Sequence, residues 1–477
     1  MTDEGQRYGG GWLLGVLLAG QFIANVDTAI VNIAVPSIAE DFPASPGQLA
    51  LVGAGYLVAY AVLLVTGARL GSLIGTRPVF LGGLLGFTVA SLACGLAPGI
   101  GWLVAARVAQ GAGAALMVPQ VLSGIQRYFS GTSRVRALGY YAVALSGGAV
   151  AGQVLGGLLI SANLFGAGWR PIFLLNVPIG ALLLVAARRV LPSEVRGPGR
   201  IDPCGVGLLS ASVLLVIMPL ALGPDQGWPL WAWLCLAMGV PAIGCFVLVE
   251  RRIAARGGRP LVAPALLRHI GVRLALVAHG LTTLTYFALL FVVALYLQQG
   301  LGMSPAYSGL AMVSWVAAFG LAGPLLPRLP PHHLRRAPWV GCLILACAYT
   351  AIWVYLVVGG RTGPTLLVLL GIGGFGLGIS SNSLIGTMTS ALPRRYAADL
   401  SGVISTNAQL SGALGVAVAS TCYESLRTGL PAADAFASVL AGFALLAVLA
   451  AGAAWRATAA RHATAARRAS SRREAAR

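Results

Sequence analysis

Residues 21–36 read QFIANVDTAIVNIAVP and form the second half of an apolar stretch that runs from about residue 11 to residue 35. A helix needs about 20 mainly apolar residues to cross the hydrocarbon core of a bilayer, so this stretch is long enough to span a membrane. Its polar residues recur at helical spacing and form one stripe: Gln21, Asn25, Thr28 and Asn32. Asp27 flanks that stripe. Such a stripe faces a bundle interior or a water-filled path, or it serves only as hydrogen-bonding glue between helices.

The whole chain has the composition of a polytopic membrane protein. Of its 477 residues, 57% are hydrophobic and only 9% are charged, against roughly 25% charged residues in soluble domains. This composition excludes an ordinary soluble enzyme, a disordered protein and a secreted disulfide scaffold. The net charge of +19 comes from arginines alone. They cluster between apolar runs, which indicates membrane topology and not a nucleic-acid-binding face.

Fourteen apolar runs are long enough to predict membrane-spanning helices, because every backbone polar group in lipid must be paired within its own segment. The predicted fold is therefore an all-α polytopic membrane protein with fourteen transmembrane helices. The predicted spans are 11–35, 48–70, 78–98, 101–127, 137–163, 171–190, 203–223, 228–249, 273–299, 306–326, 336–358, 363–390, 398–426 and 432–456.

Arginine placement predicts the orientation of these helices. Most arginines fall in alternate loops, and the other loops hold few, so the arginine-rich loops are expected in the cytoplasm together with both termini. We expect a multi-pass protein of the bacterial plasma membrane. The predicted organisation is a cytoplasmic N-terminal tail (1–10), a six-helix half (11–190), two extra helices with linkers (191–272), a second six-helix half (273–456) and a basic cytoplasmic tail (457–477).

An internal repeat supports two six-helix halves. GARLGSLIGTRPVFLGG (67–83) has its counterpart in GPLLPRLPPHHLRRAPWVG (323–341), and QGAGAALMVPQVLSGI (110–125) has its counterpart in GFGLGISSNSLIGTM (374–388). Repeated halves with a binding site at their interface are typical of secondary transporters.

Charged residues at membrane depth carry the most information about chemistry. Only Asp27 and Arg107 lie deep inside predicted spans, where a charge costs roughly 2.5–3.5 kcal/mol on insertion scales. Each needs a partner or a water-filled cavity, so we predict a functional pair; a purely structural ion pair is the alternative. Gln110 lies three residues after Arg107 and shares its helix face.

A stripe of small residues follows in the next predicted span. Gly148, Gly152 and Gly156 recur every four residues, with Gly157 adjacent. This spacing favours close helix packing, and it also suits helices that rock against each other.

Together, the segments NVDTAIVNIAVP (25–36), RVAQGAGAA (107–115), GAVAGQVLGG (148–157) and WRPIFLLNVPIG (169–180) resemble the major facilitator superfamily. The resemblance is to its fourteen-span drug:proton antiporter branch, the QacA/EmrB type, and it covers residues 11–456. It implies two six-helix halves plus two extra central helices.

The resemblance also implies roles for individual residues. Asp27 matches a first-span motif, and Arg107 and Gln110 match a fourth-span motif linked to proton coupling. Conformational gating is implied for Gly148, Gly152, Gly156 and Gly157 in the fifth span, and for Gly67, Gly71, Gly75 and Arg77 in the loop after the second span.

Two positions depart from the family pattern. Ser72 stands where the loop motif usually has aspartate, which predicts a gating ion pair that is weakened or rebuilt from other groups. Gln153 replaces a usual proline and could contact substrate or bond a neighbouring helix.

Further polar and aromatic residues could line a substrate cavity with the first-span stripe, Gln110 and Gln153. In the C-terminal half the candidates are Gln298, Asn382, Asn407, Gln409 and Trp315. Tyr286 and Phe287 could contact an apolar substrate, although such aromatics are more often core residues, and His279 is expected to be a hydrogen-bonded structural histidine.

No GxSxG, HExxH or P-loop motif occurs, so we expect no enzyme activity, no metal and no cofactor. The main hypothesis is a monomeric, proton-coupled exporter of small amphipathic or apolar compounds such as drugs or a natural product. Its partners would be the substrate, protons and the lipid bilayer, without nucleic acid. The alternatives are a non-transporting membrane sensor or scaffold on the same fold, and an uncoupled facilitator of a metabolite.

Overall fold

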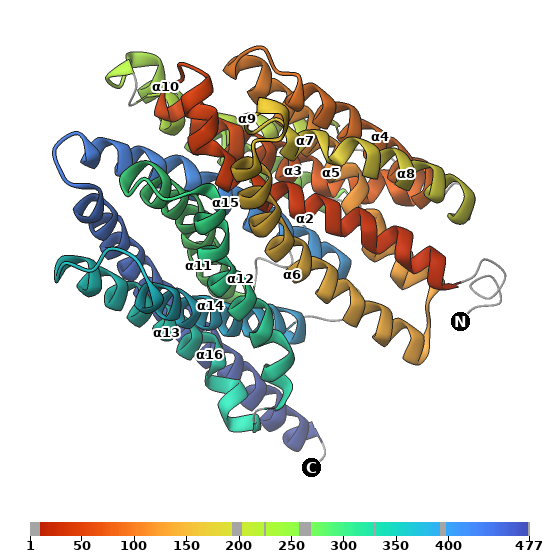
Figure 1. Cartoon of the computed structure of the whole chain (residues 1–477). Helices are drawn as coiled ribbons and strands as arrows, with labels where there is room; N and C mark the ends of the chain where they lie inside the picture. The colour runs from red at the N-terminus through yellow and green to blue at the C-terminus, as the bar shows by residue number, and fades with distance from the viewer. Residues whose placement is uncertain are drawn as a thin grey trace. The chain divides into compact units, whose positions relative to one another are not determined.

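A computed structural model describes residues 10–192, 203–223, 226–256, 269–328, 330–391 and 397–475. The described residues are helical and contain no strand, in agreement with the predicted class. The first nine helical elements run in chain order through the N-terminal half (Figure 1): α2 (Gly10–Asp41), α3 (Pro46–Ile74), α4 (Thr76–Gly95), α5 (Ile100–Tyr128), α6 (Gly131–Ala162), η1 (Leu164–Gly166), α7 (Pro171–Leu174), α8 (Asn176–Val190) and α9 (Pro203–Leu222).

The remaining elements of the described residues follow in chain order. They are α10 (Leu230–Ala255), α11 (Ile270–Leu295), the π-helical turn η4 (Tyr296–Gly300), α12 (Pro305–Leu325), η5 (Leu326–Arg328), α13 (Pro331–Val357), α14 (Pro364–Ala391), α15 (Ala397–Arg427) and α16 (Ala432–Ala475). Helix α16 continues through the segment predicted as a tail, because that segment is rich in alanine and arginine, which both favour helix.

Twelve helices among the described residues are long and apolar enough to cross a membrane, so the count of fourteen is not supported. The two differences have physical reasons. The apolar described part of α9, Gly207–Leu220, is shorter than a span. Helix α15 has sufficient length, but polar residues such as Asn407 and Gln409 lower its mean hydropathy.

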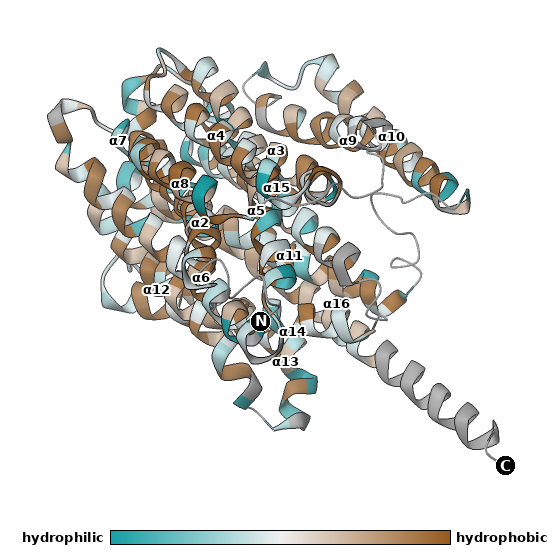
Figure 2. Cartoon of the chain, turned by 90° about the vertical axis from the view of Figure 1, so that its right-hand side faces the viewer, coloured by the Kyte–Doolittle hydropathy of each residue, from teal (hydrophilic) through white to brown (hydrophobic). Residues whose placement is uncertain are grey.

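Hydrophobic residues occupy most of the length of these helices (Figure 2). Large apolar side chains such as Leu182, Val240 and Leu230 are exposed on helix surfaces. Exposed apolar faces on helices whose backbone groups are paired internally suit contact with lipid.

The chain divides into two compact units. Unit 1 comprises Met1–Val247, Phe287–Val313 and Gly412–Ala432, and unit 2 comprises Leu248–Tyr286, Ser314–Ser411 and Ala433–Arg477. In unit 1, α5 packs against α3 and α4, α6 packs along α2, and α8 packs against α4. In unit 2, α13 packs along α14. The predicted division into halves, linkers and tails stays a prediction.

Local sequence signals explain where the helices of unit 1 begin and end. Ser45 caps α3 by accepting from the Gln48 backbone N–H at 3.2 Å, while the Gln48 side chain accepts from the Ser45 N–H at 3.0 Å. This reciprocal arrangement is a capping box. Gly75 separates α3 from α4 with a φ of 101°, a conformation that glycine adopts at little cost.

Candidate functional site

Asp27 of α2 and Arg107 of α5 form a buried ion pair in unit 1. Arg107 Nη1 lies 2.6 Å from Asp27 Oδ2, and the two side chains are 1% and 0% exposed. The two charges predicted to lie deep in the membrane therefore pair with each other in the structure. Their predicted role in proton coupling is a separate hypothesis.

Three neutral side chains complete the surroundings of this pair. Gln110 Nε2 donates to Asp27 Oδ1 at 2.8 Å, and Asn176 Nδ2 donates to the same oxygen at 2.9 Å. Both amides also donate to Ser91 Oγ, each at 3.0 Å. The network joins α2, α4, α5 and α8, and it satisfies a carboxylate that would be costly to bury alone.

Arg107 makes further contacts that fix its guanidinium. Nη1 donates to Gln110 Oε1 at 2.6 Å, and Nε donates to the Val52 carbonyl at 3.1 Å. The guanidinium carbon also lies 4.4 Å from the ring centroid of Tyr56, a cation–π distance. Gly111 permits this geometry, because a Cβ there would collide with the Tyr56 backbone.

The segment before α8 carries Asn176 into the network. Trp169 Nε1 and Arg170 Nη1 donate to Asp41 Oδ2 at the end of α2, at 3.1 Å and 2.7 Å. The Phe173 carbonyl then accepts from Ser91 Oγ at 3.0 Å. These contacts tie residues 169–176 to α2 and α4.

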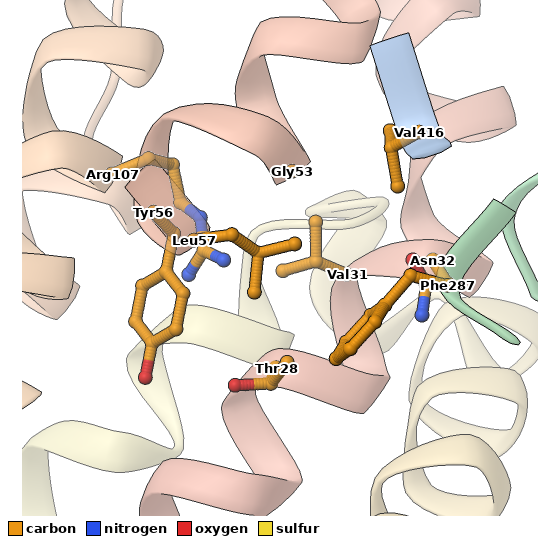
Figure 3. Close-up of a pocket in the computed structure, with 9 residues that line it drawn as sticks. All are labelled: Thr28, Val31, Asn32, Gly53, Tyr56, Leu57, Arg107, Phe287 and Val416. Carbon is orange, nitrogen blue, oxygen red and sulfur yellow. The ribbon is translucent and has the colours of Figure 1, made fainter. Parts of the chain in front are cut away.

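A small cavity borders the ion pair (Figure 3). It is lined by Thr28, Val31, Asn32, Gly53, Tyr56, Leu57, Arg107, Phe287 and Val416. Its volume is about 10 Å³, room for roughly one water molecule. A drug-sized ligand needs a pocket of roughly 300–1,000 Å³, so this conformation has no room for such a ligand at the cavity.

The cavity contains only part of the predicted polar stripe. Thr28 and Asn32 line it, whereas Asn25 and Gln21, one and two turns before Thr28 on α2, do not. Phe287, one of the two aromatic residues offered as contacts for an apolar substrate, lines it too. Gln110, which was also predicted to line a substrate cavity, bonds Asp27 in the ion-pair network.

Two other predicted cavity residues of unit 1 lie away from this cavity. Gln153 of α6 is fully buried, and its backbone carbonyl packs closely against Gly309 of α12. Gln298 of η4 donates to the Ile33 carbonyl of α2 at 3.1 Å. Both residues lie where α2 and α6 meet the η4–α12 segment.

The other predicted cavity residues, Asn407, Asn382, Trp315 and Gln409, belong to unit 2. Asn407 donates to the Leu276 carbonyl at 3.2 Å and lies 3.4 Å from His279 Nδ1, which agrees with a hydrogen-bonded structural histidine. Asn382 bonds its own helix at the Gly378 carbonyl. Trp315 stacks on Tyr349 with 5.8 Å between ring centroids, and Gln409 is half-buried.

The predicted gating glycines of α6 are sites of close helix approach. A Cβ on Gly148, Gly152 or Gly156 would lie 2.6–2.9 Å from atoms of α2. A Cβ on Gly157 would lie 2.6 Å from the Pro305 carbonyl at the start of α12. Tight packing is thus observed, and the gating role stays a prediction.

The predicted loop motif also makes specific contacts. A Cβ on Gly67 or Gly71 would collide with α5, and Gln120 of α5 donates to the Gly67 carbonyl at 2.8 Å. Arg77 Nη2 donates to the Arg188 carbonyl in the last turn of α8 at 2.6 Å. A cation is favourable there because carbonyls at a helix C-terminus carry partial negative charge. The Ser72 side chain lies outside the described residues.

Sequence reasoning missed Ser91, Asn176, Tyr56 and Gln120. Asn176 lies within residues 169–180, one of the segments that resemble the family, but the sequence did not indicate that Asn176 bonds Asp27. Ser91 carries no comparable signal, since isolated serines are common in apolar helices.

Comparisons with known proteins agree on family and fold. A family model described as Major Facilitator Superfamily matches residues 17–416. The chain is 36% identical over 436 residues to a protein named "Probable actinorhodin transporter" from Streptomyces coelicolor, covering 89% of this chain and 74% of that protein. It is 35% identical over 456 residues to "Cephamycin export protein CmcT" from Amycolatopsis lactamdurans, covering 90% and 89%. It is 31% identical over 413 residues to "Tetracenomycin C resistance and export protein" from Streptomyces glaucescens, covering 85% and 74%.

Solved structures with the same fold include that of the peptide transporter POT in complex with sulfate. Its TM-score is 0.67 at 15% sequence identity, and the match covers 94% of this chain and 95% of that chain. The POT family transporter PepTSo gives a TM-score of 0.67 at 13% identity, covering 94% and 98%. At these identities the likeness establishes the fold alone.

Proposed function

The chain belongs to the Major Facilitator Superfamily, and we propose that within this family it is a proton-coupled exporter of small, largely apolar compounds of the natural-product antibiotic class. The observation that carries this proposal is the buried Asp27–Arg107 pair inside helices apolar enough to span a membrane. A carboxylate at membrane depth is costly to retain, and such residues commonly bind a coupling ion.

The driving force is adequate for export. A proton gradient supplies ~1.4 kcal/mol per pH unit, and a membrane potential supplies ~2.3 kcal/mol per charge per 100 mV. Tenfold accumulation of a substrate requires only about 1.4 kcal/mol. One proton bound at Asp27 from outside and released inside can therefore drive export.

The lining of the cavity favours neutral or monovalent substrates. Its nine residues include no carboxylate, and the single charged residue is Arg107, which already pairs with Asp27. The apolar contacts come from Val31, Leu57 and Phe287. Relatives named for the transport, export or resistance of actinorhodin, cephamycin and tetracenomycin C support a natural product as cargo.

The size of the cavity supports alternating access. Because it holds about one water molecule, substrate binding requires the surrounding helices to separate. We place the arginine-rich loops and both termini in the cytoplasm, and we expect a monomer in the plasma membrane. Membership of the fourteen-span drug:proton branch stays a prediction.

Everted membrane vesicles that contain the protein provide the test. After energisation, uptake of a fluorescent amphipathic monovalent cation is followed before and after addition of a protonophore. Asp27→Asn is measured in parallel with Asp41→Asn, a matched control on the same helix whose carboxylate pairs with Arg170.

We expect uptake that collapses with the protonophore, is lost in Asp27→Asn and persists in Asp41→Asn. Undiminished proton-driven uptake by Asp27→Asn would remove Asp27 from the coupling mechanism. Uptake that ignores the protonophore would favour the uncoupled facilitator, and binding of the dye without any uptake would favour the non-transporting sensor or scaffold.

A further inference from the structure

Ser91 determines which atoms donate and which accept in the buried network. A serine hydroxyl has one hydrogen to donate, and the Ser91 hydroxyl lies 3.0 Å from the Phe173 carbonyl, which can only accept. The hydroxyl oxygen must therefore accept from its other two neighbours. These neighbours are Gln110 Nε2 and Asn176 Nδ2, each at 3.0 Å.

Arg107 fixes the orientation of the Gln110 amide from the opposite end. Its guanidinium can only donate, and Nη1 lies 2.6 Å from Gln110 Oε1. The amide oxygen of Gln110 therefore faces Arg107, and its NH₂ group faces Ser91 and Asp27. Two independent constraints thus select one orientation of this side chain.

As a result, Asp27 is surrounded by donors. Oδ1 receives N–H groups from Gln110 and Asn176, and Oδ2 receives the Arg107 guanidinium. An ionised carboxylate accepts all three bonds. A protonated carboxyl would find no acceptor for its O–H among these three partners, because each of them presents an N–H group.

We propose that Ser91 and Asn176 are positioning residues that hold the network in its donor-only arrangement, so that Asp27 binds a proton only when α8 or α5 moves its donor away. This inference rests on the proposed proton coupling at Asp27 and deepens it. A proton that binds forms one O–H bond on the carboxylate and neutralises it, which removes the main attraction for Arg107. Proton binding and separation of the four helices then become one event.

Few other titratable groups face Asp27. Arg107 comes from α5, and Tyr56 of α3 and Cys94 of α4 lie within electrostatic range of the carboxylate. Helix α6 approaches the neighbouring residues of α2 through glycines, and α8 contributes the Asn176 amide.

The test measures protonation of Asp27 directly in the purified full-length protein in lipid nanodiscs. Infrared difference spectra are recorded across pH, and the carbonyl band of the protonated carboxyl is assigned by its loss in Asp27→Asn. The variants are Asn176→Leu, which loses the donor, and Ser91→Ala, which loses the hydroxyl. Ser91→Thr retains the hydroxyl as a rescue variant. Thr88→Val is the matched control, because Thr88 is buried one turn earlier on α4 and bonds its own helix.

We expect the intensity of the carbonyl band of protonated Asp27 at neutral pH to rise in Asn176→Leu, because the ionised carboxylate loses one of its three donors. It should rise in the same direction in Ser91→Ala, and it should stay at the wild-type value in Ser91→Thr and Thr88→Val. Unchanged band intensity in both Ser91→Ala and Asn176→Leu would overturn the inference. Since this readout needs no transport, a protein that shows the expected intensities but fails in vesicles would refute the exporter and leave the inference intact.

Discussion

Replacing Arg107 with methionine removes the charge opposite Asp27 and keeps a flexible side chain on α5. At a separation of 2.6 Å and an effective dielectric constant of about 20, two unit charges attract each other by roughly 6 kcal/mol. Desolvation of both groups offsets part of that attraction, and removal of one partner from a buried pair costs about 3–5 kcal/mol. We therefore expect Arg107→Met to lower the free energy of unfolding by about 3–5 kcal/mol.

The double variant Asp27→Asn/Arg107→Met should be less destabilised than Arg107→Met, because no unpaired charge remains buried. We expect a recovery of about 2 kcal/mol. The assay is equilibrium unfolding of purified protein in mixed detergent micelles at neutral pH. The reasoning fails if the double variant is as unstable as the sum of the two single variants.

Arg170→Met is a matched control, because it breaks a solvent-exposed ion pair in place of a buried one. Arg170 Nη1 lies 2.7 Å from Asp41 Oδ2, nearly the same separation, but the two side chains are 31% and 42% exposed. Exposed pairs contribute about 0–1 kcal/mol, so Arg170→Met should cost no more than that. If Arg107→Met costs no more than Arg170→Met, burial does not decide the strength of the Asp27 pair.

Two further substitutions test helix contacts. In Gly152→Ala the new Cβ would lie 2.6 Å from the Val26 carbonyl, about 0.8 Å inside an ordinary 3.4 Å contact, so we expect a loss of about 1–3 kcal/mol and slower transport. Gly147→Ala, whose Cβ has no atom closer than 3.9 Å, is the control on the same helix, and equal unfolding curves would contradict the packing argument. Arg77→Met removes the hydrogen bond to the Arg188 carbonyl, and thermal unfolding should show a loss of stability of about 1.5 kcal/mol. Arg77→Lys can still donate and should retain most of that stability. Equal losses in the two variants would refute the contribution of this hydrogen bond.

The Asp27–Arg107 pairing could be predicted because elimination suffices for charges in lipid. A charge in lipid needs a partner or a water-filled cavity, and only two charges lie deep inside the predicted spans. The glycine contacts of α6 could be predicted for a similar reason, since four-residue spacing has meaning only at a helix interface. The α6 contacts with α2 follow that pattern.

Neutral polar residues could not be placed in the same way. Asn176 and Ser91 belong to the network only because α8 and α4 approach α2 and α5, and periodicity within one helix does not determine which helices meet. The same limit explains why Thr28 and Asn32 line the cavity while Gln21, on the same stripe, does not. Helical spacing predicts which residues share a face of the helix. It does not predict at which level along the helix axis a cavity lies.

Helix α2 connects the features on which the proposed transport depends. The Asp27 carboxylate bonds side chains of α5 and α8, and Ser91 of α4 joins them through the Gln110 and Asn176 amides. The face of α2 from residue 22 to residue 30 meets the glycines of α6, and the Ile33 carbonyl accepts from Gln298 of η4. Pro36 lacks an N–H, so α2 lacks the backbone hydrogen bond from residue 36 to the carbonyl of residue 32, which is next to Ile33. In the proposed mechanism, a proton that binds Asp27 would therefore act on α2, the helix that all these contacts of unit 1 share.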